Sequence, residues 1–185
     1  IMPGLIDAHH HFAVTNNNMG ATYFDPPLYV ALRIKSQLEK ILQAGFTTLR
    51  DGGGGHWSVK KATEEGLIAG PRLLISGALL SSTCGHGDFN AHGESAFPSD
   101  MQFLNLMRVC DGEDDCRKAV REQFRKGADQ IKICVTGGCA SPNDEAWHLQ
   151  FSEREIRAIV EEAEARGTYV MAHCCLLYTS DAADE

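Results

Sequence analysis

The chain has 185 residues, of which 43% are hydrophobic, and a formal net charge of −8. This length and composition suit one globular domain with a real core, and the negative charge argues against a nucleic-acid-binding or anionic-membrane-binding protein. No apolar run approaches the roughly 20 residues that a membrane-spanning helix needs, and no signal peptide precedes the first predicted strand. We therefore expect a cytoplasmic protein, although a chain that begins at Ile1 is also compatible with a leader that has been removed.

The seven cysteines are odd in number, and no pair has the CxxC spacing of a zinc finger. Cys110 and Cys116 bracket an acidic loop, and a disulfide between them would form only in an oxidising compartment. In a cytoplasmic protein we expect both to remain thiols.

The first predicted strand ends in three histidines, His9, His10 and His11, which follow an apolar run behind Pro3-Gly4. Because successive strand side chains point to opposite faces, His9 and His11 share one face and His10 takes the other. Two imidazoles at alternate strand positions can bind one transition-metal ion such as zinc. A histidine-rich loop or a tag remnant is the alternative, but three histidines fall short of a usual tag. We therefore favour a metal site.

Helical periodicity and end signals predict four helices, at residues 28–42, 58–68, 114–126 and 152–167. Ser152 and Glu155 have the spacing of a capping box at the start of the last helix. Runs of β-branched and apolar residues predict further strands at residues 46–50, 72–76, 128–135 and 168–173.

Two connecting segments have unusual compositions. Asp51 is followed by four glycines that lack the GxxxxGK[ST] pattern, so we expect a flexible loop there rather than a phosphate-binding loop. Residues 78–111 show little periodicity, and long irregular connections often form lids or binding loops. His86 in this segment is a candidate substrate-binding residue, and a solvent-exposed loop histidine is the alternative.

The alternation of strands and helices predicts an α/β fold with parallel strands and helical crossovers. An open doubly wound sheet and part of an eight-stranded barrel both fit this order. In barrels, the chemistry collects at the carboxyl ends of the strands. His11, Asp51, Lys132 and His173 all fall at or near such ends. This placement favours a partial TIM (β/α)8 barrel that comprises strands one to five with their intervening helices.

Lys132 lies between Ile131 and Ile133 in a strand that the flanking helices should bury. An isolated ammonium there would be expensive, and burial lowers the pKa of a lysine. A neutral amine can add carbon dioxide to form a carbamate, an anionic ligand with two oxygens that is able to bridge two metal ions. The alternatives are a lysine that reaches solvent at the strand end, or one paired with Asp129 or Glu145. The two histidine strands nearby lead us to favour the carbamate.

Several short motifs carry a resemblance to a known family. They lie at residues 3–11 (PGLIDAHHH), 45–51 (GFTTLRD), 85–87 (GHG), 128–138 (ADQIKICVTGG) and 171–173 (MAH). Together they resemble the amidohydrolase superfamily of metal-dependent hydrolases on a TIM barrel, most closely its Xaa-Pro dipeptidase-like and imidazolonepropionase-like branch. The resemblance covers residues 2–174, and the first motif is the most specific.

The resemblance implies a site with two divalent metal ions, for which zinc is the expected metal. His9 and His11 would bind one ion, carbamylated Lys132 would bridge to the second, and His173 would bind the second. His86 lies where related enzymes place a histidine near the substrate carbonyl.

The implied reaction is hydrolysis of a carbon–nitrogen bond in a small amide, such as a dipeptide or an N-acyl amino acid, by a metal-held hydroxide. In the family, a histidine of strand six and an aspartate of strand eight complete the site. Neither can be identified here, so no general base is assigned. A lactone or phosphotriester hydrolase, and a non-catalytic metal-binding α/β domain, are the alternatives. The implied partner is the small-molecule substrate, with no nucleic acid and no membrane, and an oligomer is compatible with the family.

We divide the chain into residues 1–174, a part of the barrel, and residues 175–185. Residues 175–185 do not continue the alternation of strands and helices. They resemble the translated read-through of a sequencing adapter, so we expect a non-native tail. We therefore expect a fragment truncated at both ends, prone to associate and inactive by itself, from a parent enzyme that is active.

Overall fold

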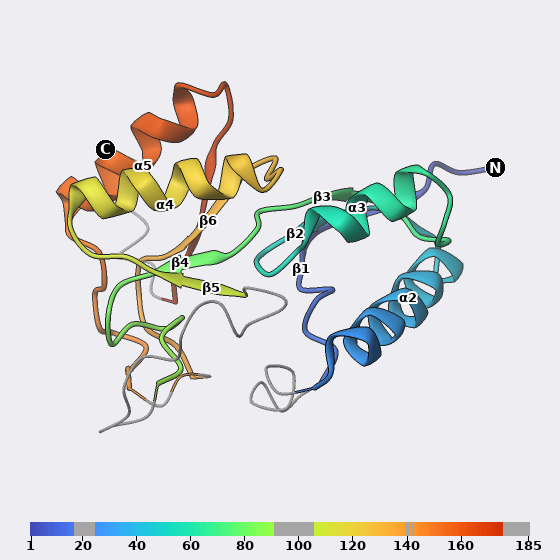
Figure 1. The fold of residues 1–185 in the computed structure, drawn as a ribbon, viewed down its shortest axis with the longest axis horizontal. Coiled ribbons are helices and arrows are strands. Elements are labelled where there is room, and N and C mark those ends of the chain that lie inside the picture. Colours follow the sequence, from blue (N-terminus) through green and yellow to red (C-terminus); the bar gives the residue numbers. More distant parts are fainter. Residues whose placement is uncertain (17–24, 91–105, 140, 142, 176–185) are drawn as a thin grey trace.

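The computed structural model describes residues 1–16, 25–90, 106–139, 141 and 143–175. Within these residues, strands and helices alternate along the chain, except that three strands follow one another between residues 72 and 109 with no helix among the described residues there (Figure 1). In order, the elements are β1 (Leu5–His10), α2 (Pro27–Gln43), β2 (Phe46–Asp51), α3 (Trp57–Glu64), β3 (Arg72–Leu74), β4 (Leu79–Ser81), β5 (Met107–Val109), α4 (Glu113–Arg125), β6 (Ile131–Cys134), α5 (Glu153–Glu164) and β7 (Val170–His173).

The strands form two parallel sheets, with the orders β1-β2-β3 and β5-β4-β6-β7. The two sheets join where β3 passes into β4, and Asp129 lies at this join. Its backbone N–H donates to the Ile75 carbonyl at 2.7 Å, and its carboxylate accepts from the Ile75 N–H at 2.8 Å. The same carboxylate binds the Lys60 ammonium at 2.7 Å, which ties α3 to the join.

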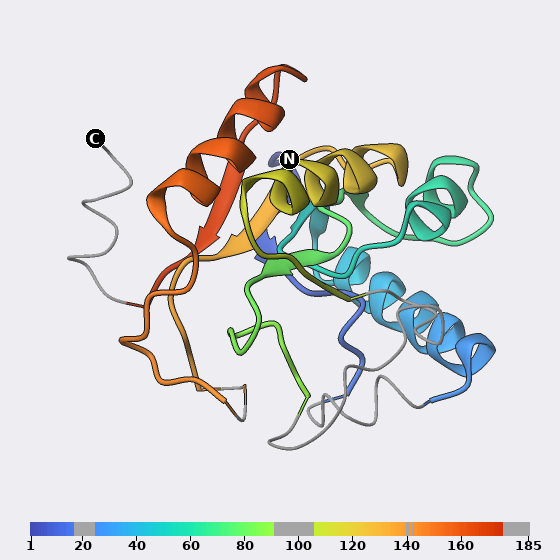
Figure 2. The same cartoon turned by 60° about the vertical axis from the view of Figure 1, so that its left-hand side comes forward.

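The helices cover one face of this curved wall (Figures 1 and 2). Val30, Ile34 and Leu38 of α2 pack against Leu49 of β2 and Leu73 of β3. This spacing of apolar residues is the face that an amphipathic helix buries.

The second core lies under α4 and α5, which are side by side in Figure 1. Val120 of α4 and Ile159 of α5 pack with Ile131 and Ile133 of β6. The residues that alternate with these isoleucines therefore face the opposite side, away from the helices. Helices on the outer face alone are typical of a barrel wall, whereas a doubly wound sheet is covered on both faces.

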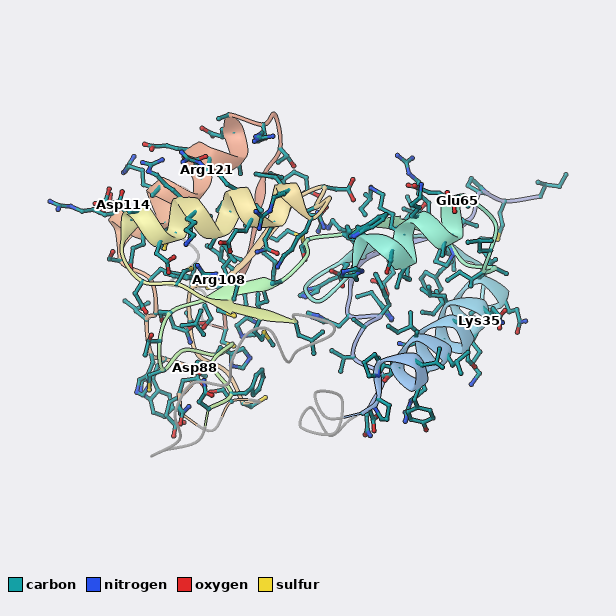
Figure 3. All side chains as sticks on the ribbon, in the orientation of Figure 1. Lys35, Glu65, Asp88, Arg108, Asp114 and Arg121 are labelled. Atoms are coloured by element: carbon teal, nitrogen blue, oxygen red, sulfur yellow. The ribbon has the colours of Figure 1, made fainter. Side chains whose placement is uncertain are left out.

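Charged side chains lie on the outer surfaces of the helices, as Lys35, Glu65, Asp114 and Arg121 show in Figure 3. Arg108 of β5 is an exception that links two elements. Its guanidinium contacts Asp115 of α4 at 2.7 Å and Glu122 of the same helix at 3.1 Å.

The four predicted helices and the five predicted strands are present, with ends shifted by a few residues. The prediction that residues 78–111 are irregular is wrong at β4 and β5, but it is confirmed for residues 82–90, which contain no helix or strand. Each of these strands has three residues, which is too short to show an alternating pattern. Residues 91–105 lie outside the described part, as do residues 176–185 of the predicted tail. No helix among the described residues is long and apolar enough to cross a membrane.

Candidate active site

Three predicted site residues come together at the carboxyl ends of β1 and β6. The His9 and His11 rings have centroids 5.2 Å apart, and the Lys132 Nζ lies 3.5 Å from His9 Nε2 across 123 residues of sequence. His10 points elsewhere, with its Nδ1 3.1 Å from Asp7 Oδ2 and its Nε2 3.5 Å from the amide of Gln37. Strand alternation thus separates His10 from the other two rings.

Lys132 is buried, with 2% of its surface exposed, on the side of β6 opposite the helices. It neither reaches solvent nor pairs with Asp129, whose carboxylate binds Lys60 instead. Desolvation lowers the pKa of Lys132, and the positive charge of Arg50 lowers it further, against opposing contributions from Cys134 and Asp51. The neutral amine of Lys132 is therefore more favoured in the protein than it is for a lysine in water.

The pKa values of the three predicted histidine ligands are lowered, mainly by desolvation. The pKa of His11 falls to about 4. The pKa of His9 is lowered by desolvation and then by the charges of Lys132 and Arg50, and that of His173 by desolvation and then by His86 and Lys132. Each ring is therefore neutral near pH 7 and keeps a lone pair, which is the form that binds metal ions.

The backbone of the glycine run after β2 contacts the side chains of His9 and His11. The Gly52 N–H donates to the His10 carbonyl at 2.7 Å, and the Gly54 N–H donates to the Gly77 carbonyl at 2.7 Å. A Cβ at Gly52 would lie 2.6 Å from His9 Cδ2 and 3.1 Å from His11 Cε1. The loop is buried and hydrogen-bonded, so the prediction of a flexible loop is wrong. Glycine is needed because the backbone itself touches the imidazoles.

Asp51 holds this glycine loop in place. Its buried carboxylate accepts hydrogen bonds from the Gly55 N–H at 2.9 Å and from the Ser76 hydroxyl at 3.2 Å. Burial raises the pKa of Asp51 to about 6, although these hydrogen bonds favour the ionised form. Asp51 thus connects the loop beneath the histidines to the chain that follows β3.

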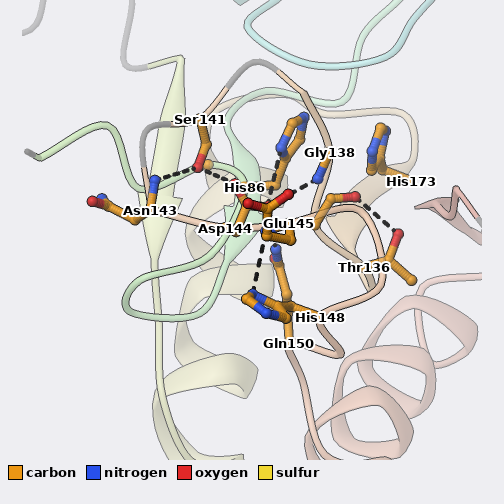
Figure 4. A network of polar contacts seen from close by, with 12 residues as sticks. His86, Thr136, Gly138, Ser141, Asn143, Asp144, Glu145, His148, Gln150 and His173 are labelled. Atoms are coloured by element: carbon orange, nitrogen blue, oxygen red, sulfur yellow. Dashed lines mark hydrogen bonds and ion pairs between the residues drawn. The ribbon is translucent and has the colours of Figure 1, made fainter.

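His86 and His173 form a second pair of rings (Figure 4). Their centroids are 4.5 Å apart and their planes differ by 13°, so the rings stack. His173 ends β7 and pairs in register with Cys134 of β6, two residues beyond Lys132. On its other side, His86 has Nδ1 3.3 Å from the Oδ2 of Asp144, a buried carboxylate. The structure thus places His86 against a predicted metal ligand rather than alone in solvent.

Sequence reasoning missed Arg50, Asp144 and Gly138 as members of this site. The Arg50 Nε donates to the Ala8 carbonyl at 2.7 Å, and its charge acts on both His9 and Lys132. Gly138 packs against the His86 ring. The glycine pair after the lysine strand was visible in the sequence, but nothing local indicated which loop it would touch.

The donor set suits a transition metal only in part. Among the described residues, no three His, Cys, Asp or Glu side chains are arranged to hold a metal ion. The arrangement is instead two histidine pairs, His9–His11 and His86–His173, with Lys132 acting electrostatically on His9, His11 and His173 alike. Neutral imidazoles are ligands that zinc and its neighbours accept. The imidazoles therefore fit a metal centre in the chemistry of their donors, and the participation of Lys132 stays a prediction.

Comparison with known proteins bears on the same residues. The amidohydrolase family model matches residues 1–184. The chain is 35% identical to ochratoxinase from Aspergillus niger, over 94% of this chain and 38% of that protein.

Solved structures with similar folds include a prolidase complexed with N-methylphosphonate-L-proline, at 48% identity and a TM-score of 0.90, over 94% of this chain and 43% of that one. A Xaa-Pro dipeptidase with methionine bound in its active site is 29% identical with a TM-score of 0.78, over 93% of this chain and 43% of that one. The chain therefore spans less than half the length of these relatives, and its fold is part of their barrel. The predicted resemblance is confirmed: the chain belongs to the amidohydrolase family.

Proposed function

We propose that this chain is part of a metal-dependent hydrolase that cleaves the carbon–nitrogen bond of a small amide, such as a dipeptide or an N-acyl amino acid. The observation that carries the proposal is the 3.5 Å approach of the Lys132 amine to His9, at the ends of two separate strands. A buried lysine beside neutral imidazoles has no evident structural purpose, because the neighbouring isoleucines already fill the core.

In this proposal His9 and His11 would hold one metal ion, His173 would hold a second, and Lys132 would serve as a ligand to both, with zinc as the expected metal. When bound, the metal ions polarise the substrate carbonyl and make water a better nucleophile near neutral pH. Amidohydrolases are typically metal-dependent, which agrees with this assignment.

Lys132 would act as a carbamate. Its neutral nitrogen attacks the carbon of carbon dioxide: the nitrogen–carbon bond forms as one carbon–oxygen π bond breaks and its electron pair moves to oxygen, and one nitrogen proton is released to solvent. Desolvation favours the first step because it lowers the pKa of the amine. The product carries a negative charge on two oxygens, and bound cations would compensate the cost of burying that charge.

The remaining residues of the site orient the ligands and the substrate. The Gly52 backbone holds His9 and His11 side by side. His86 would contact the substrate beside the second metal ion, and its stack on His173 supports this role. The amino-acid ligands in the prolidase and dipeptidase structures support a substrate whose leaving group is an amino acid.

The test uses the full-length enzyme, recovered from the gene of which this chain is a part. Lys132→Ala should lose most bound metal and most hydrolysis of a panel of dipeptides and N-acyl amino acids. Mass spectrometry under native conditions should detect the mass of one carbon dioxide on the peptide that contains Lys132. Lys61→Ala, which removes an exposed lysine of α3, is the matched control and should change neither.

A short carboxylic acid added to Lys132→Ala should restore part of the activity, because it supplies the missing carboxylate. Full retention of metal and activity in Lys132→Ala would refute the bridging role. If the enzyme binds metal and cleaves lactones or phosphotriesters but no amide, the alternative substrates would be assigned to this site.

A further inference from the structure

The loops that follow β4 and β6 pack against each other beside His173 (Figure 4). The Asn143 amide donates to the Asp88 carbonyl at 3.2 Å, which joins the loop of residues 137–150 to the loop that carries His86. The two ends of the loop that follows β6 are held together by a hydrogen bond in which the Gly137 N–H donates to the His148 carbonyl at 2.9 Å. The position of His86 therefore depends on a loop that the sequence places more than 50 residues away.

Asp144 lies in this loop, and only 1% of its side chain is exposed. Its Oδ2 accepts hydrogen bonds from the Gly138 N–H at 3.0 Å and from the Gln150 amide at 3.1 Å, and its Oδ1 accepts one from the Ser141 hydroxyl. A buried carboxylate is stable only when such donors surround it. These three donors fix the carboxylate and leave Oδ2 facing His86.

The His86 ring is held on three sides. Its Nδ1 lies 3.3 Å from Asp144 Oδ2, and one face stacks on His173 at 4.5 Å. A Cβ at Gly138 would lie 2.3 Å from His86 Cε1, so the backbone of Gly138 occupies a further side. Nδ1 is buried, has no hydrogen-bond partner among the described residues and is the ring nitrogen that faces the Asp144 carboxylate, so Nε2 is the nitrogen that remains for a substrate.

We propose that Asp144 is a positioning residue for substrate binding: it holds the His86 ring in its stack on His173 and keeps a proton on Nδ1, so that Nε2 is the substrate-facing nitrogen. A carboxylate favours an N–H on the imidazole nitrogen next to it, and this partner sets the tautomer and the ring orientation. The inference rests on the proposed function, because it concerns the substrate contact of that same site.

The first test is kinetic and uses Asp144→Asn in the full-length, metal-loaded enzyme. Asparagine keeps the shape and an acceptor oxygen but removes the charge. By analogy with residues that orient metal-bound histidines, kcat/KM should fall about 10- to 100-fold, with bound metal unchanged. Glu145→Gln is the matched control, because it removes the adjacent carboxylate, which is exposed, and it should leave kcat/KM unchanged.

A double-mutant cycle separates positioning from a general structural role. If Asp144 acts through His86, then adding Asp144→Asn to His86→Ala should cause no further loss. The inference would be overturned if the double variant lost kcat/KM by the product of the two single losses. It would also be overturned if kcat/KM fell in His86→Ala but not in Asp144→Asn. An unchanged kcat/KM in His86→Ala would instead contradict the substrate role of His86 and thus the proposed function, whatever Asp144 does.

The second test observes the ring directly, without activity. Nitrogen-15 NMR of the zinc-loaded enzyme, labelled at histidine, should show His86 with a protonated Nδ1. In Asp144→Ala the proton should move to Nε2, whereas Glu145→Gln should leave the His86 signals in place. An Nε2-protonated, Nδ1-unprotonated ring in the unmodified enzyme would overturn the inference.

Discussion

Gly52 is the single residue on which the geometry of the β1 histidines most depends. The Cβ of any other residue would lie 2.6 Å from His9 Cδ2, closer than real Cβ contacts allow. Its φ is not among the positive values found at other glycines, so an alanine could adopt its backbone conformation. The requirement for glycine at this position therefore comes from contact with the histidines.

For Gly52→Ala, we expect displacement of the His9 and His11 rings and about 10- to 100-fold weaker metal binding, because small shifts in ligand orientation have effects of this size. Metal affinity by competition with a chelating dye would measure this loss. Gly167→Ala is the control: it imposes strain at a positive φ of 71° where no atom lies within 4 Å of the new Cβ, and it should leave metal affinity unchanged. Equal affinities in both variants would contradict the supporting role of Gly52.

At the scale of elements, the capping box at the start of α5 links two helices. The Ser152 hydroxyl accepts from the Glu155 N–H at 3.4 Å, and the Glu155 carboxylate accepts from the Ser152 N–H at 2.7 Å, as the sequence predicted. The other Glu155 oxygen accepts from the N–H of Gly112, the residue that precedes α4, at 2.7 Å. One carboxylate thus satisfies backbone donors at the starts of both helices.

Replacement of Glu155 by alanine should lower the free energy of unfolding by about 1–2 kcal/mol, because it removes the reciprocal cap and the bond to Gly112. Glu153→Ala removes an exposed carboxylate from the same first turn, and we expect a change within about 0.5 kcal/mol. Urea unfolding followed by circular dichroism would measure both. A Glu155→Ala variant as stable as Glu153→Ala would show that the link between the helices contributes nothing.

At the scale of the whole molecule, β1 lies at one edge of the three-stranded sheet, and β7 lies at one edge of the four-stranded sheet. Ile6 of β1 is 69% exposed and Leu5 is 42% exposed, so this edge strand, which pairs only with β2 among the described strands, also carries exposed apolar side chains. Such an edge is a template for pairing with another chain. The chain of 185 residues, tested by itself, should therefore self-associate.

A charge on the β1 edge should suppress this association. We expect Ile6→Lys to shift the isolated chain toward monomer in sedimentation velocity, because a lysine on an edge strand opposes strand addition. Leu28→Lys, at an exposed apolar position of α2 that is 75% exposed, is the matched control and should not change the assembly. A monomeric unmodified chain, or equal effects of both substitutions, would contradict the role of β1.

The elements that could be predicted are those whose signals are local. The four helices follow from apolar spacing within about 15 residues and from end signals such as Ser152 and Glu155. The three-residue strands β4 and β5 could not be predicted, because they form only where neighbouring strands supply their hydrogen bonds. In the candidate site, His9, His11, Lys132, His173 and His86 could be named from their motifs. Asp144 could not, and the motif that contains Gly138 did not indicate its contact with His86.

The sequence by itself determined that His9 and His11 share a face, because strand alternation depends only on neighbouring residues. It also determined that Lys132 stands between two isoleucines. Only the tertiary structure decided that the Lys132 amine lies 3.5 Å from His9 and that His86 lies between Asp144 and His173. Contacts across such long stretches of sequence are set by the packing of helices against the barrel wall, and no local pattern encodes that packing.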